Sequence, residues 1–107
     1  MLSGRKSEST SEAGNISAHL IVKGLVQGVG FRWFVRSEAN HRGLTGTVAN
    51  LSDGRVEIWA EGDRSAVDDF IAALKSGNGY CRVDSIKSDF GAESGRYDDF
   101  RIKMMGI

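Results

Sequence analysis

The sequence has no excess charge of either sign and almost no cysteine. Its 107 residues include 14 Lys and Arg and 14 Asp and Glu, so the formal net charge at pH 7 is zero. This balance gives no general attraction for nucleic acids or anionic membranes, and any anion site has to be built locally. The single cysteine, Cys81, excludes an internal disulfide, and no Cys/His cluster has the spacing of a zinc site. We therefore expect no metal, no nucleic-acid partner and no membrane partner.

Long hydrophobic runs are also absent. No stretch is long enough to span a membrane, and MLSGRKSESTSEAGN, residues 1–15, lacks the apolar core of a secretory signal. These residues are polar, small and charged, which is typical of a flexible tail, and the remaining 16–107 are long enough for one compact domain. With export disfavoured and a composition that suits a reducing compartment, we predict a cytoplasmic location.

The first half of the domain predicts a strand, a helix and a hairpin. AHLIVKG, residues 18–24, alternates apolar and polar side chains as a strand does. After a glycine-rich turn, apolar residues three or four apart predict a helix from Phe31 to near Gly43. LTGTVANL and RVEIWAE, residues 44–51 and 55–61, predict two strands joined by a Ser-Asp-Gly turn.

The second half predicts one more helix and two more strands. The helix, capped by Asp63 or Ser65, has a continuous apolar face and stops at an SGNG turn. CRVDSIKSDF, residues 81–90, predicts a weaker strand with a bulge or a change of face, because Val83 and Ile86 are three positions apart. YDDFRIKM predicts the last strand.

This order of elements indicates an α+β fold. A β-α-β-β-α-β arrangement with a further C-terminal strand is typical of the ferredoxin-like sandwich, an antiparallel sheet of four to five strands with two helices on one face. Mixed polar and aromatic side chains on the first strand and the hairpin suit the opposite, helix-free face. They are His19, Lys23, Arg55, Glu57 and Trp59.

VQGVGFRWFVR, residues 26–36, opens a helix without the usual Ser, Thr, Asp or Asn cap. Arg32 places a cation at the positive end of the helix, which costs about 0.3–1 kcal/mol unless an anion is bound. Gly28 and Gly30 allow close approach to the backbone, whose free N–H groups form a nest for a tetrahedral anion. The guanidinium adds a planar fork of donors. The pattern favours an anion site; the alternative is a tight turn with a solvated arginine.

Asn50 is the second candidate, at the end of the strand before the Asp53-Gly54 turn. Taken alone, it is better explained as a residue that starts the turn. In the ferredoxin-like arrangement, however, the first strand lies beside the strand of residues 55–61, so the glycine-rich loop and Asn50 share one edge of the sheet. A carboxamide there can donate and accept hydrogen bonds at once, as holding a water molecule requires.

VKGLVQGVGFRWFV, followed by GLTGTVANLSDGRVEIWAEGD and VDDFIAAL, resembles the acylphosphatase family. The resemblance runs from about His19 to Ile102. It implies hydrolysis of small acyl phosphates to carboxylate and inorganic phosphate by in-line attack of water, with no metal and no cofactor. The family's catalytic arginine and asparagine fall on Arg32 and Asn50. Its phosphate-binding backbone amides fall on Gln27, Gly28, Val29, Gly30, Phe31 and Arg32.

The sequence departs from the family pattern at three positions. Thr47 stands where tryptophan is common, Ala49 where a basic residue is common, and Lys23 where smaller or polar residues often occur. None of these removes a catalytic group, but Thr47 and Ala49 bear on substrate affinity. We expect a monomer.

Two other interpretations remain open at this stage. One is a catalytically silent ferredoxin-like module that binds an anion or a partner; an RNA-binding version of it would need paired aromatic residues on the central strands, and Trp59 has no obvious aromatic partner on the first strand. The other is a regulatory acylphosphatase-like domain of a larger carbamoyl-phosphate enzyme. The end of the chain just after the last strand favours a free-standing protein.

Overall fold

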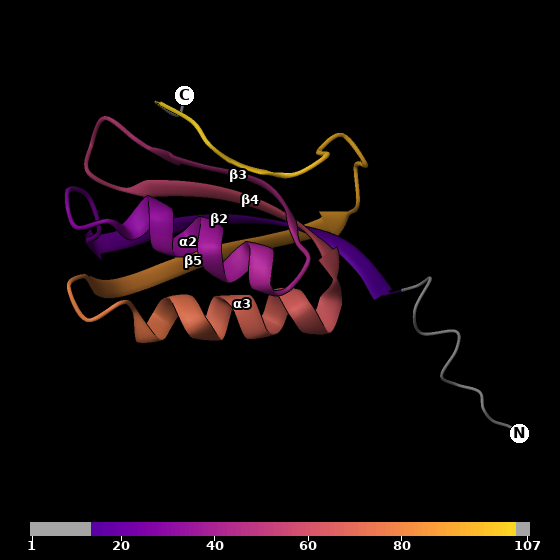
Figure 1. Cartoon of the computed structure of the whole chain (residues 1–107), viewed down its shortest axis with the longest axis horizontal. Coiled ribbons are helices and arrows are strands. Elements are labelled where there is room, and N and C mark those ends of the chain that lie inside the picture. The colour runs from indigo at the N-terminus through magenta and orange to yellow at the C-terminus, as the bar shows by residue number, and fades with distance from the viewer. Residues whose placement is uncertain (1–13, 105–107) are drawn as a thin grey trace, which may run out of the picture.

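The computed structural model describes residues 14–104, which form five strands and two helices (Figure 1). The strands are β2 (Asn15–Leu25), β3 (Thr45–Asn50), β4 (Val56–Asp63), β5 (Arg82–Ala92) and β6 (Phe100–Ile102), and the helices are α2 (Phe31–His41) and α3 (Arg64–Ser76). Of the predicted tail, residues 1–13 lie outside the described range, and Asn15 already pairs with Asp63 as the first residue of β2.

All strands belong to one sheet, in the order β5-β2-β4-β3-β6. The first four pair antiparallel, whereas β6 runs parallel to β3, so the sheet is mixed. The parallel pairing arises because the chain leaves β5 at one edge and crosses to the opposite edge before forming β6 (Figure 1). The ferredoxin-like α+β prediction is confirmed, with the fifth strand as a parallel addition.

Both helices cover the same face of the sheet and bury the apolar faces predicted for them (Figure 1). Phe31, Val35 and Ala39 of α2 and Val67, Phe70 and Leu74 of α3 lie in one core with alternate residues of the strands. Burying each large side chain contributes about 1.5–3 kcal/mol to folding. Neither helix within residues 14–104 is both long and apolar enough to cross a membrane.

The bulge predicted in the fifth segment lies in β5. Lys23 pairs with Ser85 and Gly24 pairs with Val83, so Asp84 is an extra residue on that strand. This insertion is why the apolar positions of β5 are out of phase. The backbone of β5 comes so close at this point that a Cβ on Gly24 would lie 2.0 Å from the carbonyl oxygen of Arg82.

The opposite face of the sheet carries the polar and aromatic residues. His19 and Trp59 stack there with ring centroids 4.2 Å apart, and His19 Nε2 lies 2.8 Å from Glu57 Oε2. The imidazole is thus the ring partner of Trp59 on the first strand, held by a neighbouring carboxylate on β4.

Glu61, on the same face, is covered by the segment after β5 and is only 2% exposed. Its carboxylate accepts hydrogen bonds from Ser94 N, Ser94 Oγ and Gly95 N at 3.0, 2.7 and 3.1 Å. Burial by itself raises the pKa of this carboxyl, but the hydrogen bonds outweigh it and hold the pKa below the usual value for Glu. Glu61 therefore fastens the crossing segment to the sheet.

Candidate active site

The loop between β2 and α2 presents free backbone donors at the start of a helix. Gly30 is the N-cap of α2 in a left-handed conformation (φ 76°), and no side chain caps the helix. Among residues 14–104, none accepts a hydrogen bond from the backbone N–H groups of residues 27–33; Phe34 is the first to donate, to Gly30 O at 3.1 Å. The loop therefore has the donors of an anion-binding nest.

Arg32 lies in the first turn of α2, directly beside these amides. Its Nη1 donates to the backbone carbonyl of Lys103 at 3.2 Å, and Lys103 N–H donates in turn to Val48 O at 2.8 Å. No carboxylate of the described residues forms an ion pair with Arg32. Within residues 14–104, the guanidinium is thus held by a neutral carbonyl, which leaves its other N–H groups for a ligand.

Asn50 is the last residue of β3 and pairs with Val56. Its Oδ1 atom is buried and accepts no hydrogen bond from the described residues. Leaving a buried acceptor unpaired costs about 1–3 kcal/mol. Residues with a merely structural role rarely leave a buried polar atom without a partner. The position of Asn50 at the end of the strand is as predicted, and within residues 14–104 its Oδ1 accepts no hydrogen bond from the turn.

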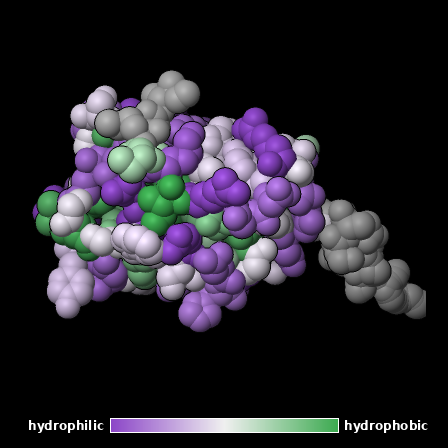
Figure 2. Space-filling model, turned by 45° about the horizontal axis from the view of Figure 1, so that its top comes forward, coloured by the Kyte–Doolittle hydropathy of each residue, from purple (hydrophilic) through white to green (hydrophobic). Residues whose placement is uncertain are grey.

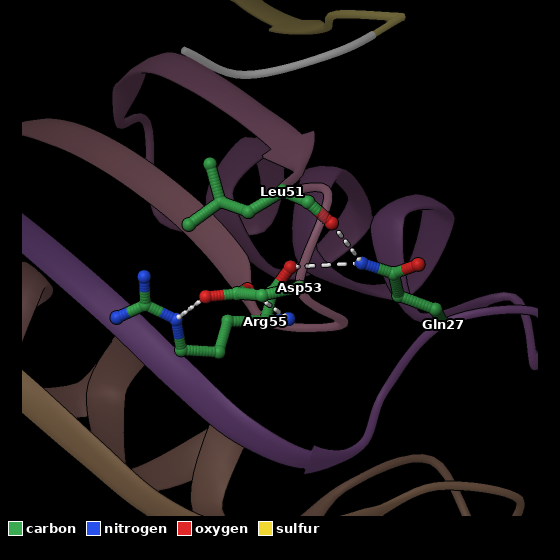
Figure 3. A network of polar contacts seen from close by, with 4 residues as sticks. All are labelled: Gln27, Leu51, Asp53 and Arg55. Carbon is green, nitrogen blue, oxygen red and sulfur yellow. Dashed lines mark hydrogen bonds and ion pairs between the residues drawn. The ribbon is translucent and has the colours of Figure 1, made fainter.

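That turn is formed by Asp53 instead. Its carboxylate accepts hydrogen bonds from Arg55 N at 3.1 Å and from Arg55 Nε at 2.7 Å (Figure 3). The backbone N–H and the guanidinium of Arg55 hold the pKa of Asp53 below its usual value. The prediction that Asp53 serves the turn is therefore confirmed.

The loop and the β3–β4 turn are tied together by the side chain of Gln27. Its Nε2 donates to the carbonyl oxygens of Leu51 and Arg55 at 2.8 and 2.9 Å (Figure 3). Since Leu51 follows Asn50, this contact brings the amide-rich loop next to the second candidate residue. The sequence analysis assigned only the backbone amide of Gln27, because acceptors 24 and 28 residues away leave no local signal.

A second polar side chain holds the loop from the other direction. Asn78, in the segment between α3 and β5, donates from Nδ2 to Val29 O at 3.3 Å. Its Oδ1 accepts from the backbone N–H groups of Tyr80 and Cys81 at 2.9 and 3.0 Å. The loop is therefore supported by two segments that are distant in the sequence.

Hydrophobic side chains reach the surface at this end of the molecule, which lies at the left in Figure 2. Leu25, at the end of β2, is 52% exposed and Met104, next to Lys103, is 90% exposed. Trp33, in the first turn of α2, is 62% exposed and has Arg36 over its ring at 4.3 Å. Among the described residues, no group of three or more His, Cys, Asp and Glu is arranged to hold a metal ion.

Comparison with known proteins decides the family. The sequence model of the acylphosphatase family matches residues 18–102. The chain belongs to the acylphosphatase family. An acylphosphatase from Bacillus pumilus is 42% identical over 88 residues, which cover 82% of this chain and 98% of that protein.

Solved structures agree with this family. The crystal structure of acylphosphatase from Bacillus subtilis matches with a TM-score of 0.80 and 42% identity, covering 82% of this chain and 98% of that one. An acylphosphatase from Coxiella burnetii matches with a TM-score of 0.80 and 34% identity, covering 92% and 100%. The predictions of the family, the ferredoxin-like fold and an acylphosphatase enzyme are confirmed, and a catalytically silent module is not favoured.

Proposed function

We propose that the loop between β2 and α2 binds the phosphoryl group of a small acyl phosphate, and that the chain hydrolyses it to a carboxylate and inorganic phosphate. The observation that carries this proposal is the set of uncapped N–H groups of residues 27–33 beside Arg32, which has no carboxylate partner among the described residues. A site made only of donors and a cation favours an anion with several acceptor oxygens.

In this proposal the backbone amides of Gln27 through Arg32 and the guanidinium of Arg32 bind the phosphoryl oxygens. Phosphoryl transfer depends almost entirely on positioning and on stabilising charge on those three oxygens. Donors that are fixed before the substrate arrives pay no reorganisation cost as the charge shifts in the transition state. They therefore accelerate the reaction to the extent that they bind the transition state more tightly than the substrate.

Asn50 orients the attacking water. The water oxygen forms a bond to phosphorus while the bond between phosphorus and the acyl oxygen breaks on the opposite side, and the electron pair leaves with the carboxylate. One of the two protons of the water stays on the attacking oxygen and the other passes to another phosphate oxygen, which gives dihydrogen phosphate. A carboxylate is the conjugate base of a strong enough acid to leave without protonation, so the reaction needs neither a general acid nor a metal ion.

The deciding experiment compares two classes of substrate. We expect the purified protein to hydrolyse a small acyl phosphate such as acetyl phosphate, and to leave a phosphate monoester of an alkyl alcohol intact, because an alkoxide is a far poorer leaving group. Release of phosphate from the monoester at a similar rate would contradict the proposed mechanism, and no release from any acyl phosphate would contradict the function.

We also make proposals about the oligomeric state and the location of the protein. We propose that the protein works as a monomer in the cytoplasm on a free small molecule. Its net charge of zero, which gives no general attraction for nucleic acid or membrane, supports the small-molecule substrate. Sedimentation at several protein concentrations tests the first point, because a dimer would show a concentration-dependent mass. Fractionation of cells tests the second.

A further inference from the structure

We infer that the side chain of Gln27 is a positioning residue, which sets the phosphate-binding loop against the end of β3 that carries Asn50. This inference rests on the proposed function and adds a role for the carboxamide of Gln27, distinct from that of its backbone amide. Its basis is the pair of hydrogen bonds from Nε2 to Leu51 O and Arg55 O, at 2.8 and 2.9 Å (Figure 3).

The two acceptors close the β3–β4 turn. Leu51 N–H donates to Arg55 O at 2.8 Å, and Gly54 N–H donates to Leu51 O at 3.2 Å. Gln27 thus adds one further hydrogen bond to each of the two carbonyls that the turn itself already uses. A shift of the loop would have to break both bonds or carry the turn along, so the loop and the turn move as one unit.

A primary amide suits this place. One nitrogen carries two N–H groups, and each of them meets one of the two carbonyls. A Glu of the same length would point acceptors at acceptors, and a Met would fill the space without donating. The half-buried position of Gln27 makes the lost hydrogen bonds more costly than at an exposed site.

The consequence for the reaction is geometric. Phosphoryl oxygens are placed by the loop amides and by Arg32, whereas the attacking water is placed by Asn50, which directly precedes Leu51. In-line attack requires the water to lie opposite the leaving group of the bound phosphoryl group. A displacement of either by about 1 Å can lower the rate about 100-fold. Gln27 is the direct side-chain link between the loop and the residue next to Asn50.

The test is Gln27→Met, alone and combined with Asn50→Ala. We expect the single change to lower kcat by about 10- to 100-fold while the inhibition constant of inorganic phosphate stays within about threefold, because the amides and Arg32 remain. In the Asn50→Ala background, Gln27→Met should lower kcat less than about threefold, because the side chain that orients the water has already been removed. Equal losses in both backgrounds would overturn the inference.

Gln27→Glu and Asn40→Ala complete the set. With Gln27→Glu, activity relative to the unmodified protein should rise as the pH falls, because a protonated carboxyl can again donate to one carbonyl. Asn40 is an exposed carboxamide on α2, so Asn40→Ala should leave kcat unchanged. A flat pH dependence of the Gln27→Glu ratio would contradict a role through donated hydrogen bonds.

A readout without turnover separates this inference from the proposed function. NMR of the 15N-labelled protein measures the response to inorganic phosphate. Phosphate should shift the backbone amide signals of the loop and those of residues 51–55. In Gln27→Met only the shifts of residues 51–55 should be lost. If acyl phosphates are not hydrolysed but this pattern is seen, the function fails and the coupling stands. If the signals of residues 51–55 respond equally in both proteins, or phosphate does not bind, the inference fails.

Discussion

Arg32 Nη1 donates to the backbone carbonyl of Lys103, 71 residues further along the chain, at 3.2 Å. Lys103 is itself bound to β3, through its N–H and Val48 O at 2.8 Å. Val48 is two residues before Asn50 on that strand. The two side chains proposed to act on the substrate are therefore supported by the same strand, Arg32 through Lys103 and Asn50 directly.

Arg32→Lys should lose most of the activity. A lysine keeps the charge but has no planar fork to bind two oxygens, and it does not reproduce the bond to Lys103 O in the same geometry. We expect kcat/KM for a small acyl phosphate to fall by about 100-fold or more, close to the effect of removing one oxyanion donor. Arg36→Lys, one turn further along the same helix, is the matched control and should retain activity. Turnover at the original rate in Arg32→Lys would remove this residue from its role.

Asn50→Ala should separate catalysis from binding. Because the amides and Arg32 are untouched, we expect a fall in kcat of at least about 10-fold with little change in the inhibition constant of phosphate. Thermal unfolding should change little, since the substitution also removes a buried oxygen that has no partner among the described residues. If phosphate affinity fell as much as kcat, Asn50 would be a binding residue instead.

Chelation should leave the reaction unaffected. The carboxylate leaves without help, so no cation has to neutralise it, and the phosphoryl charge is matched by N–H donors and Arg32. We expect equal rates with and without EDTA, and no stimulation by added Mg²⁺. Hydrolysis that appeared only after a divalent ion was added would contradict this.

Glu61→Gln should change how stability depends on pH. The pKa of Glu61 is depressed in the folded protein, so its hydrogen bonds to Ser94 and Gly95 stabilise the fold above the unfolded pKa and are lost as the pH falls through the folded pKa. At pH 7 we expect Glu61→Gln to cost about 1–3 kcal/mol in the free energy of unfolding. As the pH falls through the folded pKa of Glu61, the two proteins should converge.

Denaturant unfolding at a series of pH values measures this effect. Asp68→Asn, at an exposed position on α3, is the control and should follow the unmodified protein throughout. A constant difference between Glu61→Gln and the unmodified protein at every pH would show that the ionised carboxylate is not what the crossing segment needs.

Gly24→Ala should destabilise the fold strongly. The added Cβ would lie 2.0 Å from Arg82 O and 2.9 Å from Asp84 N, both backbone atoms, and Gly24 has a positive φ of 143°. Strain and overpacking together lead us to expect a loss of about 3 kcal/mol or more. Gly91→Ala, on β5, meets nothing within 4 Å and has no positive φ, so it should change the free energy of unfolding little. Similar stabilities of the two variants would mean that β5 can move away from β2.

Much of the fold follows from signals that lie within a few residues of one another. The apolar spacing from Phe31 to Ala39, the Asp53 turn and the offset between Val83 and Ile86 each report local geometry, and the helix, the turn and the bulge are found there. The absence of a cap before α2 is also local, and it suggested a ligand because unpaired donors at a helix start need a partner. The family resemblance then assigned roles to Arg32 and Asn50 that local patterns alone left open.

Local sequence signals are enough to specify the helices, the hairpin and the glycine-rich loop with its arginine, because backbone preference and hydrophobic period act over short distances. Three features depend on the folded arrangement: the parallel pairing of β6, the burial of Glu61 under residues 94 and 95, and the hydrogen bonds of Gln27 to the β3–β4 turn. These contacts join residues 24 to 54 positions apart, and a hydrogen bond across such a distance depends on where the folded sheet places its acceptors. No periodic pattern in the chain encodes that placement.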